Sequence, residues 1–141
     1  MNKKFWWGVF WTVLAVFVSN FIIHQLIMKG TYAATSSLWR AESEMANTWP
    51  AMMFGQLLFG FFIFWIYSIG YKGKGWSEAW RFAIYFGSLQ AANTFIMYSV
   101  APYTWGLVWS LVFWGFVQMW VIGLVATWSI KTWKIQPIAW N

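Results

Sequence analysis

The stretch Phe5–Met28, FWWGVFWTVLAVFVSNFIIHQLIM, decides the fold class, because it is apolar and contains no Asp, Glu, Lys or Arg. An α-helix rises about 1.5 Å per residue, so about 20 apolar residues cross the hydrocarbon core of a bilayer. Three further stretches have similar length and character: Pro50–Gly70, Ser77–Val100 and Tyr103–Ile130. The sequence therefore predicts an all-α bundle of four transmembrane helices, forming one integral membrane domain over residues 1–141.

The composition also indicates a membrane protein. Hydrophobic residues make up 61% of the 141 positions, and only 9% are charged, whereas soluble domains carry about 25% charged residues. Lipid around the apolar surface removes the need for a charged exterior. Many of the 15 tryptophans fall near the ends of the predicted spans, where indole rings favour the headgroup level. The absence of cysteine excludes disulfides and thiolate metal sites.

A cleavable signal peptide is the rival interpretation of the first segment. Such a peptide has an apolar core of about 7–15 residues and small residues before the cleavage point. Phe5–Met28 is longer, and no clean A-x-A site follows it. We therefore expect a retained helix.

Positive charges concentrate on one side of the predicted helices. Lys29 and Arg40 lie in the first loop, where Glu42 and Glu44 balance them. The other seven of the nine Lys and Arg residues lie on the opposite side: Lys3, Lys4, Lys72, Lys74, Arg81, Lys131 and Lys134. The positive-inside rule then places both termini in the cytoplasm. The net charge of +6 faces anionic headgroups, so we expect membrane lipids, and no nucleic acid, as charged partners.

The connections between the spans carry their own signals. In the first loop, Ser36 or Ser37 is expected to cap a short helix lying on the outer surface. Ser77 is expected to cap the third span, with Glu78 at the positive end of its helix dipole. The Ala101-Pro102-Tyr103 turn joins the last two spans, which predicts a tight antiparallel hairpin.

Polar side chains inside the spans are the main candidates for a functional site, because polar groups in lipid need partners. The six are Asn20, His24, Gln56, Gln90, Asn93 and Gln118. We interpret them as a hydrogen-bonded network that holds the helices together. A polar ligand or proton site, or the polar path of a small transporter, is the alternative. The pairs Ala51/Gly55 and Gly87/Ala91 predict close helix contacts, because small residues at this spacing let backbones approach.

Methionines gather toward the end of the helices that carries His24. Thioether and imidazole ligands suit Cu(I), so copper binding is an alternative function. The residues that would bind the copper are His24, Met52, Met53 and Met97. No MxxM or HxxxH spacing reinforces it, and Met commonly fills gaps in apolar cores. Our leading expectation is therefore no metal and no other cofactor.

Catalysis by this chain alone is not expected. The sequence contains no Asp and only one His, and no charged residue lies between Arg81 and Lys131. One histidine supplies neither a three-ligand metal site nor a nucleophile with its base and orienting group. We predict that the protein is not an enzyme.

Several short segments resemble small four-helix bacterial inner-membrane proteins of unassigned function. They are the lysine-rich start, the His24-Gln25 pair, LWR at Leu38–Arg40 and GKGWSEAWR at Gly73–Arg81. The resemblance implies the four-helix fold and the inner membrane, and it implies no activity and no binding residue.

The short loops and the abundant aromatic surface suggest a function. The loops are too short to hold an independent active site, and the aromatic side chains exceed what four helices need for their own packing. The sequence therefore favours a structural or accessory subunit of a larger membrane complex, with a bioenergetic complex or a metal-dependent oxidase as our first candidates.

Overall fold

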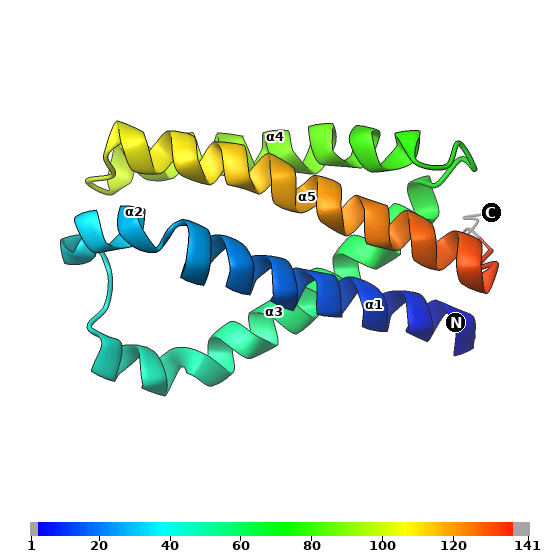
Figure 1. The fold of residues 1–141 in the computed structure, drawn as a ribbon, viewed down its shortest axis with the longest axis horizontal. Coiled ribbons are helices and arrows are strands. Elements are labelled where there is room, and N and C mark those ends of the chain that lie inside the picture. Colours follow the sequence, from blue (N-terminus) through cyan, green and yellow to red (C-terminus); the bar gives the residue numbers. More distant parts are fainter. Residues whose placement is uncertain (1–2, 137–141) are drawn as a thin grey trace.

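The regular elements of the protein are all helices, as expected. The computed structural model describes residues 3–136, apart from the side chain of Glu42, and contains no strand in that range (Figure 1). In chain order the elements are α1 (Lys3–Asn20), the π-helical η1 (Phe21–Ile27), α2 (Lys29–Ala34), the 3₁₀ turn η2 (Ser36–Leu38), α3 (Glu42–Gly70), α4 (Ser77–Val100) and α5 (Trp105–Trp133). The all-α class is confirmed.

Three helical stretches are long and apolar enough to cross a membrane: Lys3–Ile27, Ser43–Gly70 and Trp105–Trp133. They match the first, second and fourth predicted spans. α4 has 24 residues, which is length enough, but Ser88, Gln90 and Asn93 make it less apolar than the other three. The integral membrane class is therefore supported by three helices.

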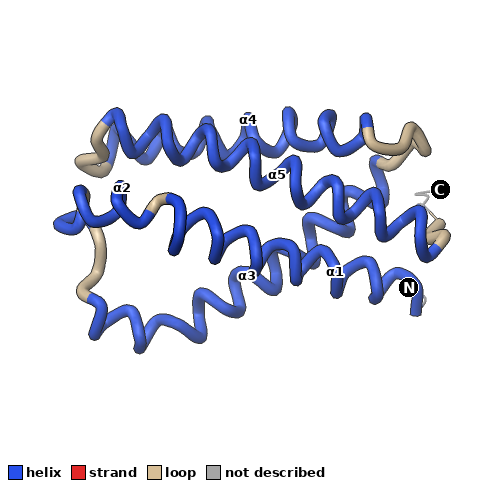
Figure 2. Tube along the Cα trace, in the orientation of Figure 1, coloured by secondary structure: helices blue, strands red, loops and turns tan. Residues whose placement is uncertain are grey.

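α5 packs between α1 and α4 (Figures 1 and 2). α4 and α5 lie side by side and antiparallel, joined by residues 101–104, which confirms the predicted hairpin. Gly123 permits their close approach, because a Cβ there would lie only 3.0 Å from Ala79 Cα. The buried core of the bundle is formed by α1, α3, α4 and α5, with Val16 of α1, Phe64 of α3 and Ile122 of α5 fully enclosed.

α3 stands apart from the bundle over its first half and then crosses α1 near Gly60. At the crossing, a Cβ on Gly60 would lie 2.7 Å from Val13 Cγ2, and one on Gly8 would overlap the Phe64 ring. Between residues 43 and 59, all side chains of α3 are exposed except the half-buried Met53 and Gln56. Figures 1 and 2 show this half of α3 standing apart from the other long helices.

Several helix ends differ from the predictions. α3 begins at Glu42, so Pro50 lies inside the helix instead of in its first turn. Pro50 has no N–H to donate to the preceding turn, but the side chains around it are exposed and nothing packs on the weakened turn. The first loop does contain a short helix, α2, yet Ser36 and Ser37 make no capping bond.

The starts of α4 and α5 are held differently. Ser77 does not cap α4: its hydroxyl donates to the Lys74 carbonyl at 3.0 Å. Trp76 occupies the N-cap position, and Glu78, in the first turn, holds the preceding loop instead. At α5, Thr104 Oγ1 accepts a hydrogen bond from Leu107 N at 3.2 Å, as a capping threonine does.

The first span changes its helical form near its end. After Asn20 the chain forms wider, π-type turns, and Met28 N donates to Ile23 O, five residues back, at 2.8 Å. π-helical turns are rare and occur frequently at functional sites. This segment carries His24.

Candidate intramembrane binding site

A chain of side-chain amides links α1, α3 and α5. Gln118 Nε2 donates to Asn20 Oδ1 at 3.0 Å and to Ser19 Oγ at 3.2 Å. Asn20 Nδ2 in turn donates to Gln56 Oε1 at 3.2 Å. Gln118 is only 4% exposed, so this network lies where the three helices converge.

The hydrogen bond made by Ser19 sets the direction of this network. The Ser19 hydroxyl donates its proton to Val16 O at 3.2 Å, so toward Gln118 it can only accept. The Gln118 atom that faces Ser19 is therefore the amide nitrogen. Gln118 also donates to Asn20, and Asn20 donates to Gln56. The network ends on the Gln56 amide nitrogen, which donates to no group among the described residues.

Two cavities adjoin the end of the network, with volumes of about 540 and 940 Å³. Asn20, His24, Met52 and Gln56 border both of them. The cavities exist because the half of α3 that begins at residue 43 stands off the bundle and leaves these side chains uncovered. The end of the molecule that carries His24 is called the outer end and the end that carries Glu78 the inner end, after the topology expected from the charges. The smaller cavity extends to Gln118. Polar side chains uncovered at membrane depth are unusual without a function.

The other two predicted amides lie in different surroundings. Gln90, on α4, borders the smaller cavity and lies against α5, where a Cβ on Gly115 would be 3.1 Å from its amide carbon. Asn93 is exposed and borders neither cavity. The structure thus brings Asn20, Gln56 and Gln118 into direct contact, places Gln90 beside them, and leaves Asn93 apart.

His24 bonds a tyrosine, whereas we expected a neighbouring amide. Its Nδ1 lies 2.6 Å from Tyr32 Oη. The Tyr32 ring packs edge-on against Trp39 with centroids 5.1 Å apart, so the pair is held from the outer loop. Burial, assisted by nearby Tyr103, raises the pKa of Tyr32 to about 12. The hydroxyl therefore keeps its proton at neutral pH and anchors the imidazole at the cavity edge.

The four residues of the copper alternative are only partly brought together. His24 and Met52 border both cavities, and Met53 borders the larger one. Met97 is exposed on α4 and borders neither. Within residues 3–136, no three His, Cys, Asp or Glu side chains group closely enough to hold a metal ion.

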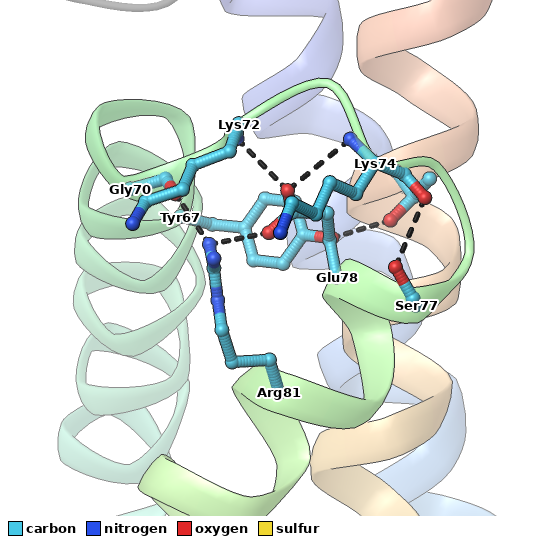
Figure 3. Close-up of polar contacts among 8 residues, drawn as sticks. Tyr67, Gly70, Lys72, Lys74, Ser77, Glu78 and Arg81 are labelled. Carbon is cyan, nitrogen blue, oxygen red and sulfur yellow. Dashed lines mark hydrogen bonds and ion pairs between the residues drawn. The ribbon is translucent and has the colours of Figure 1, made fainter.

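A second polar cluster, at the opposite end of the molecule, was not recognised from the sequence. Glu78 is only 2% exposed and accepts hydrogen bonds from the backbone N–H groups of Lys72, at 2.9 Å, and Lys74, at 3.3 Å. It also forms an ion pair with Arg81, whose guanidinium donates to Gly70 O (Figure 3). The available signal was one acidic residue directly after a basic, glycine-rich turn. The cluster clamps that turn.

Phe86 stands between the two ends of the molecule. It borders the smaller outer cavity and also an inner cavity of about 280 Å³ beside Glu78 and Arg81. Its ring packs against Phe82, with centroids 4.5 Å apart. The outer cavity is therefore separated from the inner one by aromatic side chains.

Comparison with known proteins identifies no relative: no protein-family model, no curated protein and no solved structure matches the chain.

Proposed function

We propose that the protein is an accessory subunit of a larger membrane complex and that it docks through the outer half of α3. The observation that carries this proposal is a row of exposed residues along one face of that helix. The row, here called the α3 stripe, consists of Ala51, Gly55, Leu58 and Phe62. Its spacing of four, three and four residues places it on one helical face.

Gly55 distinguishes this stripe from an ordinary lipid-facing surface. A Cβ on Gly55 would meet nothing within 4 Å, whereas the same atom on Gly60 would meet Val13 of α1 at 2.7 Å. The space beside Gly87 is likewise occupied, because a Cβ there would overlap the Phe116 ring of α5. Small residues at a spacing of four are a packing motif between membrane helices. Gly55 also borders the smaller cavity, but no helix of the described chain meets a Cβ placed there, which supports a helix from another subunit as the partner of the exposed Ala51/Gly55 pair.

The proposal includes an orientation. In it, the protein lies in the bacterial cytoplasmic membrane, α4 is a fourth span, and both ends of the chain face the cytoplasm. Lys131 lies over the Trp76 ring at 5.0 Å, so the basic residues of the α3–α4 turn and of the end of α5 share one end of the molecule. That arrangement supports one positively charged, cytoplasmic side.

The test is purification in mild detergent followed by native mass spectrometry, with two glycine variants compared. Gly55→Leu fills the stripe, while Gly106→Leu is the matched control, because a Cβ on Gly106 also meets nothing within 4 Å. We expect the unmodified chain and Gly106→Leu to co-purify with larger subunits, with a bioenergetic complex as first candidate, and Gly55→Leu to lose them. A stable monomer without partners would overturn the proposal.

A small transporter is the second candidate, favoured by the cavity that reaches Gln118. A transport path would have to continue past Phe86 to the inner cavity. Copper binding is favoured by one observation, the shared position of His24 and Met52 on both cavities. Copper that is retained by the purified chain and lost on replacing Met52 and Met53 by Leu would support it, and unchanged metal content would reject it.

A further inference from the structure

We propose that the two outer cavities form one binding site for an uncharged amphiphile whose polar end carries a carbonyl oxygen. The site lies on the side of α3 that faces the bundle and shares one residue, Gly55, with the α3 stripe. Its polar residues Asn20, His24 and Gln56 lie off the stripe, so the binding site does not depend on the proposed docking.

The charge of the site excludes ionic headgroups. No Asp, Glu, Lys or Arg is among the residues that border either cavity. A charged ligand at membrane depth would lack a counter-ion and would lose its hydration. The polar residues present are neutral amides and His24, so the matching ligand is neutral.

The direction of the amide network selects the polar group of the ligand. Because Ser19 forces Gln118 to donate, the donors run through Asn20 and leave the Gln56 amide nitrogen as the last donor. Successive hydrogen bonds polarise one another, which strengthens that terminal donor. Gln56 is half-buried, and an N–H group that faces a lipid-exposed cavity without a partner is costly, so the best ligand presents an acceptor, such as a carbonyl oxygen.

The remaining lining suits a hydrocarbon chain or a flat ring. Most of it is apolar or aromatic: Phe17, Val18, Phe21, Trp49, Phe59, Phe86, Leu89 and Met119. Volumes of about 540 and 940 Å³ fall in the range of about 300–1,000 Å³ that small-molecule sites occupy. The π-helical segment η1 supplies Phe21, His24 and Gln25 to this wall. Both chemical halves of an amphiphile are thus accommodated.

Membrane quinones and acylglycerols share this chemistry, and the experiment separates them. Two probes are titrated into the purified chain in detergent: a benzoquinone with a ten-carbon tail, and a short-chain diacylglycerol. Bound ligand is counted by native mass spectrometry. We expect saturable binding of at least one probe with one molecule per chain. Binding of only one identifies the source, and no saturable binding of either overturns the proposal.

Matched variants show whether bound probe occupies the cavities. Gln56→Leu removes the terminal donor, and we expect its dissociation constant to rise at least about tenfold. Gln90→Leu is the second variant: its side-chain amide makes no hydrogen bond within the described chain, so its loss spares the fold while weakening binding. Asn93→Leu, which removes an amide outside both cavities, should bind as the unmodified chain does. Equal affinities in all three variants would mean non-specific partitioning and would overturn the proposal.

Discussion

Gln118 and Asn20 are 98 residues apart in the chain, yet Gln118 Nε2 lies 3.0 Å from Asn20 Oδ1, joining α5 to α1. This hydrogen bond connects the polar residues of α5 to those of α1 and α3. It converts isolated polar residues on separate helices into a directed network with one open end.

Replacing Gln118 by Leu should lower the free energy of unfolding, because the half-buried Asn20 loses its hydrogen-bond donor. Hydrogen bonds between membrane helices average about 0.6 kcal/mol and reach about 1.7 kcal/mol, and an orphaned acceptor adds to the cost. We expect a loss of about 1–2 kcal/mol, measured by reversible SDS unfolding in mixed micelles. Asn93→Leu is the control and should change little; a larger loss for that variant would contradict the assignment.

Replacing Glu78 by Ala should release the turn between α3 and α4. The carboxylate holds the backbone N–H groups of Lys72 and Lys74, which are also trypsin cleavage points. Removing a buried partner of an ion pair costs about 3–5 kcal/mol, and Arg81, at 31% side-chain exposure, reduces this to about 2–3 kcal/mol by its access to water. We expect faster tryptic cleavage at both lysines.

Two further variants in the same region provide the reference cleavage rates for that experiment. Glu78→Gln retains one carbonyl oxygen for the backbone donors, so its cleavage rate should lie between those of the unmodified chain and Glu78→Ala. Ser77→Ala removes an exposed hydroxyl from the same turn and should cleave at the unmodified rate. The clamp would be refuted by a Ser77→Ala rate matching that of Glu78→Ala.

Adding one methyl group at Gly123 should separate α4 from α5. The new Cβ would lie 3.0 Å from Ala79 Cα and 3.2 Å from its carbonyl oxygen, and helix backbone cannot rotate away as a side chain can. Overpacking of this kind costs about 1–3 kcal/mol. Gly106→Ala, where nothing lies within 4 Å, should be neutral or slightly stabilising. Thermal unfolding in detergent compares the two, and equal stabilities would be inconsistent with the close contact.

Tyr32 should make the protein sensitive to alkaline pH. Burial and Tyr103 raise the pKa of its hydroxyl from 10.0 to about 12, so between these values the unfolded chain loses a proton that the folded chain keeps. The stabilisation is complete below pH 10 and is lost as the pH rises toward 12. The stability difference between the unmodified chain and Tyr32→Phe should therefore shrink over that interval. A difference independent of pH would show that the buried hydroxyl is not responsible.

Phe86 should separate the outer cavity from the inner one. The chain has no cysteine, so Gln90→Cys introduces a single reactive thiol at the outer cavity. In the proposed orientation, we expect a membrane-impermeant thiol reagent to reach it from the outer side only. Adding Phe86→Ala should permit reaction from the inner side, because Phe86 borders both cavities. Inner-side reaction while Phe86 is present would favour the transporter instead.

The polar residues of the site could be predicted from the sequence composition. Polar residues within apolar stretches need partners, so Asn20, Gln56 and Gln118 were identifiable from the sequence. Their mutual contacts were not, because helices that are apolar on all sides carry no pattern that tells which face meets which neighbour. Asn93 shows the difference: it is as polar as Asn20, yet it lies outside both cavities.

The sequence by itself determined the helical class, the α4–α5 hairpin, the segregation of charge and, of the four predicted spans, the three that the structure supports, because these depend on local composition and spacing. Only the tertiary structure decided that the part of α3 before Gly60 diverges from the bundle and that the first span becomes π-helical around His24. It also decided that Glu78 is buried against the turn that precedes α4. The divergence of α3 depends on a contact between residues distant in sequence, Val13 and Gly60. The other two features depend on contacts across a turn, between Tyr32 and His24 and between Glu78 and the Lys72 backbone. Local propensity fixes each helix, but shape-matched packing between helices fixes the cavities.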